Sequence, residues 1–208
     1  MSHVQVFSIT TALLGSGSIA TLTIFDVPEL QSQPDSRSLS SIRWLFSIGS
    51  RIFPSTSLLS AIGFIYCAST SNSQSPLWFL ANNTSKSNTF LAAAALVFSI
   101  APFTKIMIPT NFALIEMNKI LGGSRSEKAS QHQGDSLSDR SAWESVKGTG
   151  EGFEFTDRSG PQQRTEREST TEEDEIVRQL LERSRWLNLV RAMFVGAGEV
   201  IGPNAALT

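Results

Sequence analysis

Metal-ligating and redox side chains are scarce in this sequence, which has one cysteine, Cys67, and two histidines, His3 and His132. One cysteine cannot form an intrachain disulfide, a Cys-x-x-Cys redox pair or a thiolate metal cage. Two histidines outside the apolar stretches do not supply the inward-facing ligands of a haem or di-iron centre. No complete dinucleotide fingerprint follows a strand pattern. We therefore expect no metal site and no haem, nicotinamide or flavin cofactor, and we interpret Cys67 as a small packing residue.

A block of positive charge is also missing. The 17 Lys and Arg residues are offset by 19 Asp and Glu residues, and the formal net charge is -2. The polar part of the chain mixes both signs and has no basic patch that would match a phosphate backbone. We therefore expect no nucleic-acid partner.

The sequence contains three long apolar runs, although its average hydrophobic content is only 40%. Val4–Phe25 and Ile52–Thr70 contain no charged residue, and Asn88–Ile115 is interrupted only by Lys105. About 20 apolar residues are enough for a helix to cross the roughly 30 Å hydrocarbon core of a bilayer. Each run therefore predicts a transmembrane helix in a lipid bilayer. The first exceeds the apolar core of a signal peptide and follows no Lys or Arg, so we expect it to be retained.

A fourth run, Leu187–Leu207, contains two charged residues and is a weaker candidate for a span. The chain before it favours a long helix. Thr170 and Glu173 have the spacing of a capping box, and further acidic residues crowd the same turn. Trp186 is suited to the headgroup level. We predict that this helix begins outside the membrane and then enters it; the alternative is three spans plus a surface helix.

The predicted fold is thus all-α, an integral membrane four-helix bundle with a disordered cytoplasmic loop before the last helix. Residues 1–119 hold the first three transmembrane helices, and residues 120–169 form a polar loop of low complexity. Residues 170–208 form an amphipathic helix that continues into the fourth span. The loop has too few apolar residues to offset the entropy of ordering it, so we expect it to be disordered.

The distribution of Lys and Arg predicts the orientation. With four spans, one face collects three of these residues in segment 26–51 and eleven in segment 116–185, and the other face has only Lys86. The positive-inside rule then places both termini in the lumen or outside, and the long loop in the cytoplasm. The endoplasmic reticulum is the default membrane for this arrangement. Overlapping glycosylation sequons at Asn82 and Asn83 fall on the predicted lumenal side.

Polar side chains at membrane depth are the candidate functional residues, because no water is available there to satisfy them. Thr104 and Asn111 are two turns apart in the third run, so an unbroken helix places them on one face. Asn188 and Arg191 are three residues apart in the fourth run and also share a face.

Each of these residues also has a purely structural explanation. Thr and Asn commonly tie membrane helices together, and Arg191 would in that case neutralise a carboxylate such as Glu199 or Glu116. Pro109 removes a backbone hydrogen bond, and we expect it to kink the third helix and open room near Asn111.

Four groups of residues carry a resemblance to a known family. They are a Gly- and Ser-rich first span ending near Pro28-Glu29-Leu30, then Trp44…Gly49…Pro54, then Pro102-Phe103-Thr104…Pro109-Thr110-Asn111…Leu114, and finally Leu187-Asn188-Leu189-Val190-Arg191 before a Gly-rich end. In this order they resemble the anthrone oxygenase family, small four-span membrane proteins common in fungal polyketide clusters. The resemblance covers nearly the whole chain outside the polar loop. Family members usually have a Trp about three residues before the Leu-Asn pair, where Ser184 stands here and Trp186 is shifted.

The resemblance implies oxidation of an anthrone polyketide to an anthraquinone by O2 in secondary metabolism, a monooxygenase reaction without a cofactor. Loss of a proton from the central methylene of an anthrone gives an electron-rich anion that can reduce oxygen itself. In this hypothesis Asn111 and Asn188 hydrogen-bond the ketone or the neighbouring phenols, Arg191 stabilises the anionic charge, and Thr104 orients a partner or a water. The sequence does not identify the general base, and Glu116 is one candidate.

Two other functions stay open. A non-catalytic membrane partner would use its helices to anchor the polar loop to a biosynthetic enzyme, and deletion of residues 120–169 would then abolish function. A small carrier would move a hydrophobic metabolite through the same polar pocket without changing it. The charge rings, repeated halves and proton-relay chains that favour transport are missing from the sequence. The sequence does not specify an oligomeric state.

Overall fold

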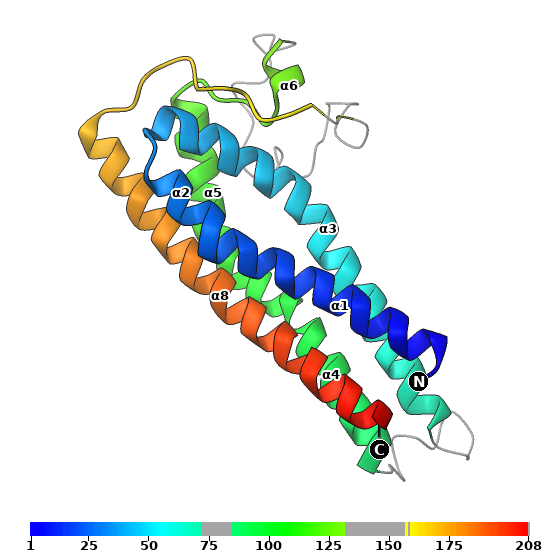
Figure 1. Ribbon diagram of the computed structural model, residues 1–208. Helices are drawn as coiled ribbons and strands as arrows, with labels where there is room; N and C mark the ends of the chain where they lie inside the picture. Colours follow the sequence, from blue (N-terminus) through cyan, green and yellow to red (C-terminus); the bar gives the residue numbers. More distant parts are fainter. Residues whose placement is uncertain (72–84, 132–156, 158, 208) are drawn as a thin grey trace. The chain divides into compact units, whose positions relative to one another are not determined.

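The computed structural model describes residues 1–71, 85–131, 157 and 159–207, and this part of the chain is helical without strands. The prediction of an all-α fold is confirmed. The helices are α1 (His3–Thr21), the π-helix η1 (Leu22–Asp26), α2 (Val27–Gln31), α3 (Asp35–Thr70), α4 (Ser85–Phe98), α5 (Ile100–Ile120), α6 (Glu127–Gln131) and α8 (Thr171–Leu207) (Figure 1). The sequons at Asn82 and Asn83 lie outside the described residues.

Three stretches of the described chain are helices long and apolar enough to cross a membrane: His3–Gln31, Asp35–Thr70 and Ser85–Ile120. They contain the first three predicted spans. The fourth predicted span, in α8, is not among them. Its apolar residues Ala192 and Val195 are nevertheless buried in a common hydrophobic core with the other helices, so α8 is the fourth helix of the bundle.

The third apolar run is divided into two helices by a single residue, Ser99. Pro109, near which we expect a kink, lies inside the continuous helix α5. The interruption between α4 and α5 precedes Pro102. This proline cannot donate to the carbonyl of Phe98, and its ring crowds that carbonyl, so the helix cannot continue unchanged through this turn. The amide of Phe103 bonds the Ser99 carbonyl (3.2 Å) and starts the new helix.

The described chain forms two compact units. Unit 1 contains residues 1–23, 51–106 and 187–208, and unit 2 contains residues 24–50 and 107–186. Helices α3, α5 and α8 each contribute one part to each unit.

Unit 1 is held together by apolar packing and by hydroxyl groups that bond across helices. Its core includes Ile19, Phe64, Phe90 and Val97 with Cys67, which is a buried free thiol. Three serines donate to carbonyls of a neighbouring helix: Ser60 to Ser8 (2.7 Å), Ser57 to Val97 (2.7 Å) and Ser87 to Ala68 (3.1 Å). Such bonds are a usual means of joining helices in a membrane, where burial of apolar surface gives no advantage.

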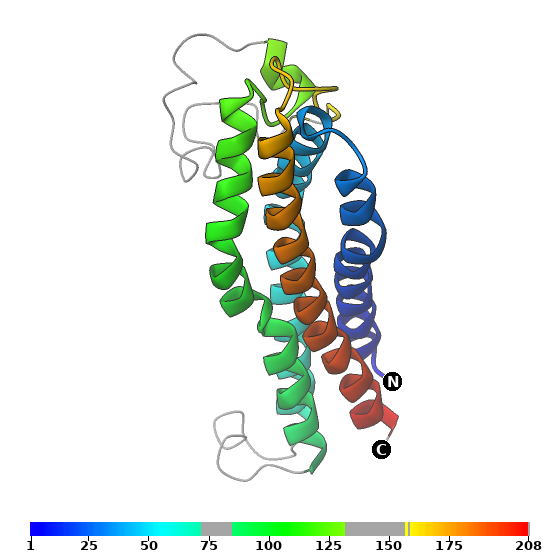
Figure 2. The same ribbon diagram turned by 90° about the vertical axis from the view of Figure 1, so that its left-hand side faces the viewer.

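Glycines let the helices of unit 1 approach one another closely. A Cβ on Gly63 would lie 1.8 Å from Ser8 Oγ of α1. A Cβ on Gly198 would lie 3.0 Å from the Ala93 carbonyl oxygen, which explains how the end of α8 runs side by side with α4 (Figures 1 and 2). Small residues at these contacts give the close approach that favours helix association in a bilayer.

Unit 2 includes the two ends of the segment 120–169 that we predicted to be disordered. The backbone amides of Thr165 and Arg167 bond the carbonyls of Ser36 (2.7 Å) and Leu121 (3.0 Å), and the indole of Trp44 bonds the Ser159 carbonyl (2.9 Å). The backbone bonds offset part of the ordering entropy without needing apolar side chains. Residues 132–156, the middle of the segment, lie outside the described residues.

The predicted capping box at the start of α8 is confirmed. The amide of Thr170 donates to the Glu173 carboxylate (2.8 Å), and the amide of Glu173 donates to Thr170 Oγ1 (3.3 Å). The Arg167 guanidinium also bonds Glu173 (2.6 Å). This bond and those of Thr170 lower the pKa of Glu173 to about 2.

Candidate functional site

The centre of the candidate site is a buried arginine on α8. Arg191 is only 6% exposed, and Asn188, one turn before it, is also buried. Both belong to the face of α8 that carries the core residues Ala192 and Val195. The spacing therefore puts the two predicted residues on the inward face of the helix, as helical periodicity requires.

Arg191 lies against an aromatic ring and not against an acid. Its Cζ is 5.2 Å from the centroid of the Phe53 ring of α3, within the range of a cation–π contact. Arg191 forms no ion pair with a carboxylate of the described residues, and its buried Nε has no hydrogen-bond partner there. The alternative in which it neutralises Glu199 or Glu116 is not what the structure shows.

Glu116 has a different partner and a different environment. It lies in unit 2, its side chain is half exposed, and its carboxylate is 3.8 Å from Nζ of Lys119 one turn further along α5. Glu116 therefore does not belong to the unit that holds Arg191.

Glu199 is the buried acid of unit 1. It is 6% exposed, it lies near Ser16 of α1, whose hydroxyl donates to the Leu13 carbonyl (3.4 Å), and its Oε1 is buried without a hydrogen-bond partner among the described residues. The sequence analysis considered Glu199 only as a counter-ion. A local signal was present, since Glu199 follows Arg191 by eight residues and Val195 by four on the same helix.

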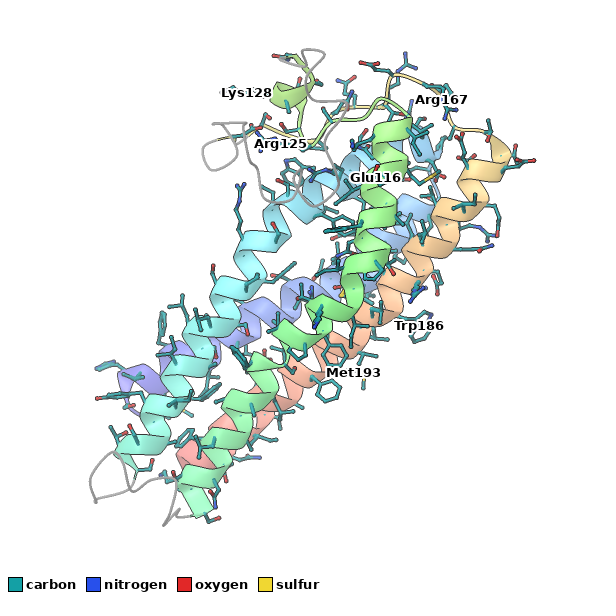
Figure 3. All side chains as sticks on the ribbon, turned by 180° about the vertical axis from the view of Figure 1, so that it is seen from behind. Glu116, Arg125, Lys128, Arg167, Trp186 and Met193 are labelled. Carbon is teal, nitrogen blue, oxygen red and sulfur yellow. The ribbon has the colours of Figure 1, made fainter. Side chains whose placement is uncertain are left out.

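Aromatic side chains add flat apolar surface to unit 1. The rings of Phe103 on α5 and Phe194 on α8 have centroids 5.1 Å apart and are tilted by 43°. By contrast, Met193 of unit 1 is 66% exposed and points away from the helices (Figure 3). Trp186, in unit 2, is also exposed, so the shifted tryptophan does not take part in a buried site.

The two predicted residues of α5 fall in different units. Thr104 belongs to unit 1, is half buried, and donates its hydroxyl to the Ile100 carbonyl of its own helix (2.8 Å). It therefore has only acceptor capacity left for a ligand. Asn111 belongs to unit 2, where its Oδ1 is buried without a hydrogen bond among the described residues. The structure thus brings Thr104, Asn188 and Arg191 into one unit and leaves Asn111 in the other.

Two further residues of unit 2 are buried and polar, although we did not name them as candidate site residues. Thr110 is 2% exposed, and its Oγ1 has no hydrogen bond among the described residues. Arg43 is 4% exposed, although we counted it among the charges of an exposed segment. Its position four residues after the buried Leu39 could have placed it on the inward face of α3.

These features define a helical integral membrane protein with buried polar groups inside its helix bundle. In the part of the chain that the structure describes, no group of three or more His, Cys, Asp or Glu side chains is placed to hold a metal ion. The chain belongs to the anthrone oxygenase family, since the family model described as "Anthrone oxygenase" matches residues 43–149, half of the sequence. No curated protein and no solved structure matches the chain.

The matched residues include Arg43, Phe53, Thr104 and Asn111 and end before α8. The resemblance that we drew over nearly the whole chain is thus shown for its central half. Asn188, Arg191 and Glu199 lie outside the match, and their importance depends on the structure of unit 1.

Proposed function

We propose that the protein oxidises an anthrone-type polyketide to an anthraquinone with O2 and without a bound cofactor. The overall reaction converts one anthrone and one O2 to one anthraquinone and one water. A base removes a proton from the central methylene, and the resulting anion passes an electron to O2. The carbon–oxygen bond then forms to give a hydroperoxide, and cleavage of its O–O bond with loss of water leaves the second ketone.

The observation that carries this proposal is the environment of Arg191. A guanidinium that is buried, lies on an aromatic ring and has no acid partner among the described residues is costly unless a ligand pairs with its charge. The enolate oxygen of an anthrone anion provides the matching negative charge. In a buried environment, a donor already in place stabilises the developing anion more than it would in solution.

The neighbouring groups fit a flat apolar substrate with oxygens at its edge. The rings of Phe53, Phe103 and Phe194 belong to the same unit as Arg191 and can contact an aromatic ligand. Asn188, on the same face of α8, supplies an amide for the ketone or an adjacent phenol. Thr104, in the same unit, is limited to accepting a hydrogen bond, because its hydroxyl donates to the Ile100 carbonyl.

The test is turnover of a hydroxylated anthrone by membranes that contain the protein, with the quinone measured by mass spectrometry in the presence and absence of O2. Anthrones oxidise spontaneously, so the background is set by membranes containing Arg191→Gln at equal abundance. Arg185→Gln is the matched control, because Arg185 is on the same helix but is partly exposed and paired with Glu182 (3.4 Å).

We expect wild type and Arg185→Gln to convert the anthrone alike, and Arg191→Gln to fall by about 10²–10³-fold, the usual cost of removing one oxyanion donor. Equal rates in wild-type and Arg191→Gln membranes for several anthrones would remove the basis of the proposal. Movement of unchanged anthrone across vesicles would instead indicate a carrier.

A further inference from the structure

We propose that Glu199 is the general base that removes the methylene proton, an assignment that rests on the proposed function. The base is the one participant that the sequence does not identify. Within the described part of unit 1, Glu199 is a buried acid with a carboxyl oxygen that has no competing donor.

One carboxyl oxygen of Glu199 is available to accept a proton. Ser16 of α1 lies near the carboxyl group, but its hydroxyl donates to the Leu13 carbonyl of its own helix (3.4 Å). The Oε1 atom of Glu199 is buried and accepts no hydrogen bond within the described residues. A buried acceptor without a donor is unfavourable, and a proton or a donor from the substrate relieves that cost.

The position of Glu199 relative to Arg191 matches the shape of the substrate. Both belong to unit 1 and both are buried on α8, with Glu199 eight residues further along. Eight residues correspond to about 12 Å of helix axis. In an anthrone the ketone and the methylene lie on opposite sides of the central ring. A substrate lying along α8 therefore directs its ketone to Arg191 and its methylene to Glu199.

The protons of the reaction balance if Glu199 acts as a base twice. The carboxylate takes the first methylene proton, and the substrate anion adds to O2 after electron transfer. The resulting peroxide anion takes this proton back and becomes a hydroperoxide. Glu199 then removes the second proton from the same carbon while the O–O bond breaks, and the departing hydroxide takes that proton to form water. The carboxylate is regenerated, and O2 is the oxidant.

The test compares two isosteric substitutions in membranes at equal abundance. Glu199→Gln keeps the size of the side chain and its contact with Ser16 but cannot accept the proton. Glu116→Gln is the control, because Glu116 is the other candidate base and is half exposed and paired with Lys119. We expect Glu199→Gln to lower kcat by about 10²–10⁴-fold, the range for general base catalysis, and Glu116→Gln to leave it near wild type.

A hydrogen isotope effect separates a base from a merely structural acid. With substrate deuterated at the methylene, we expect the isotope effect on kcat/KM to increase in Glu199→Asp, because the shorter side chain makes proton removal slower. If Glu199→Gln converts the anthrone as fast as wild type, the assignment of Glu199 is overturned and the proposed function is not affected. An isotope effect that Glu199→Asp does not alter would also overturn it. If wild-type membranes convert the anthrone no faster than Arg191→Gln membranes, the proposed function itself is overturned.

Discussion

The close contact of Gly63 on α3 with Ser8 on α1 lets us predict how much stability unit 1 loses when Gly63 is replaced by alanine. In Gly63→Ala the new Cβ would lie 1.8 Å from Ser8 Oγ and 3.0 Å from Ser8 Cβ. Ser8 is held on both sides, since its hydroxyl donates to the Val4 carbonyl (2.8 Å) and its own carbonyl accepts from Ser60 (2.7 Å). Either Ser8 gives up its hydroxyl bond or the two helices separate. Overpacking of this kind costs about 1–3 kcal/mol.

The assay is thermal or denaturant unfolding of the protein in detergent, with Gly17→Ala as the matched control. Gly17 is also helical and in unit 1, but no atom lies within 4 Å of the position of its Cβ. Gly17→Ala should be neutral or stabilising by up to about 1 kcal/mol. The double variant Ser8→Ala with Gly63→Ala should recover part of the loss, because it removes the nearest atom. If Gly63→Ala unfolds like Gly17→Ala, the close contact of α1 with α3 is not as described.

Three further results are expected from unit 1 and unit 2. Ser60→Ala removes a buried bond between α3 and α1 and should destabilise the protein by about 1 kcal/mol, measured by the same unfolding assay; an unchanged midpoint would show that the bond contributes nothing. Trp44→Phe should speed hydrogen exchange or proteolysis near Ser159, whose carbonyl the indole holds (2.9 Å), and protection equal to wild type would contradict this. Because the pKa of Glu173 is lowered from 4.5 to about 2, its stabilisation of α8 is complete above about pH 4.5 and is lost as the pH falls toward 2. Hydrogen exchange in the first turn of α8 should increase over this interval in wild type and change less in Arg167→Gln.

Features with local causes could be predicted from the sequence. The capping box of Thr170 and Glu173 was predicted because each side chain bonds the backbone three residues away. The inward positions of Asn188 and Arg191 follow from helical periodicity. The family was also suggested by short motifs and is confirmed by the match over residues 43–149.

Features that depend on distant parts of the chain could not be predicted. Pro102 and Pro109 lack the same backbone donor, yet the helix is interrupted before one and continues through the other. The sequence does not reveal whether the backbone carbonyl one turn before each proline, which loses its helical donor, is bonded by another group. Likewise, nothing in the order of residues indicates that Arg191 lies on the Phe53 ring, or that Ser60 donates to the Ser8 carbonyl. These contacts join helices far apart in the sequence.

Hydrogen bonds join the two ends of the polar segment, close to α6 and to residue 160. The length of chain between these ends can therefore change without moving the start of α8. The amide of Glu127 bonds the Gly160 carbonyl (2.9 Å), and the amide of Lys128 bonds Ser159 Oγ (3.2 Å). Residues added between these anchors do not separate the bonded groups, and each doubling of a flexible connection costs only about 0.6 kcal/mol. This interval is therefore the natural place for an epitope tag or a reporter domain, which would show the side of the membrane it occupies while leaving the helices in register.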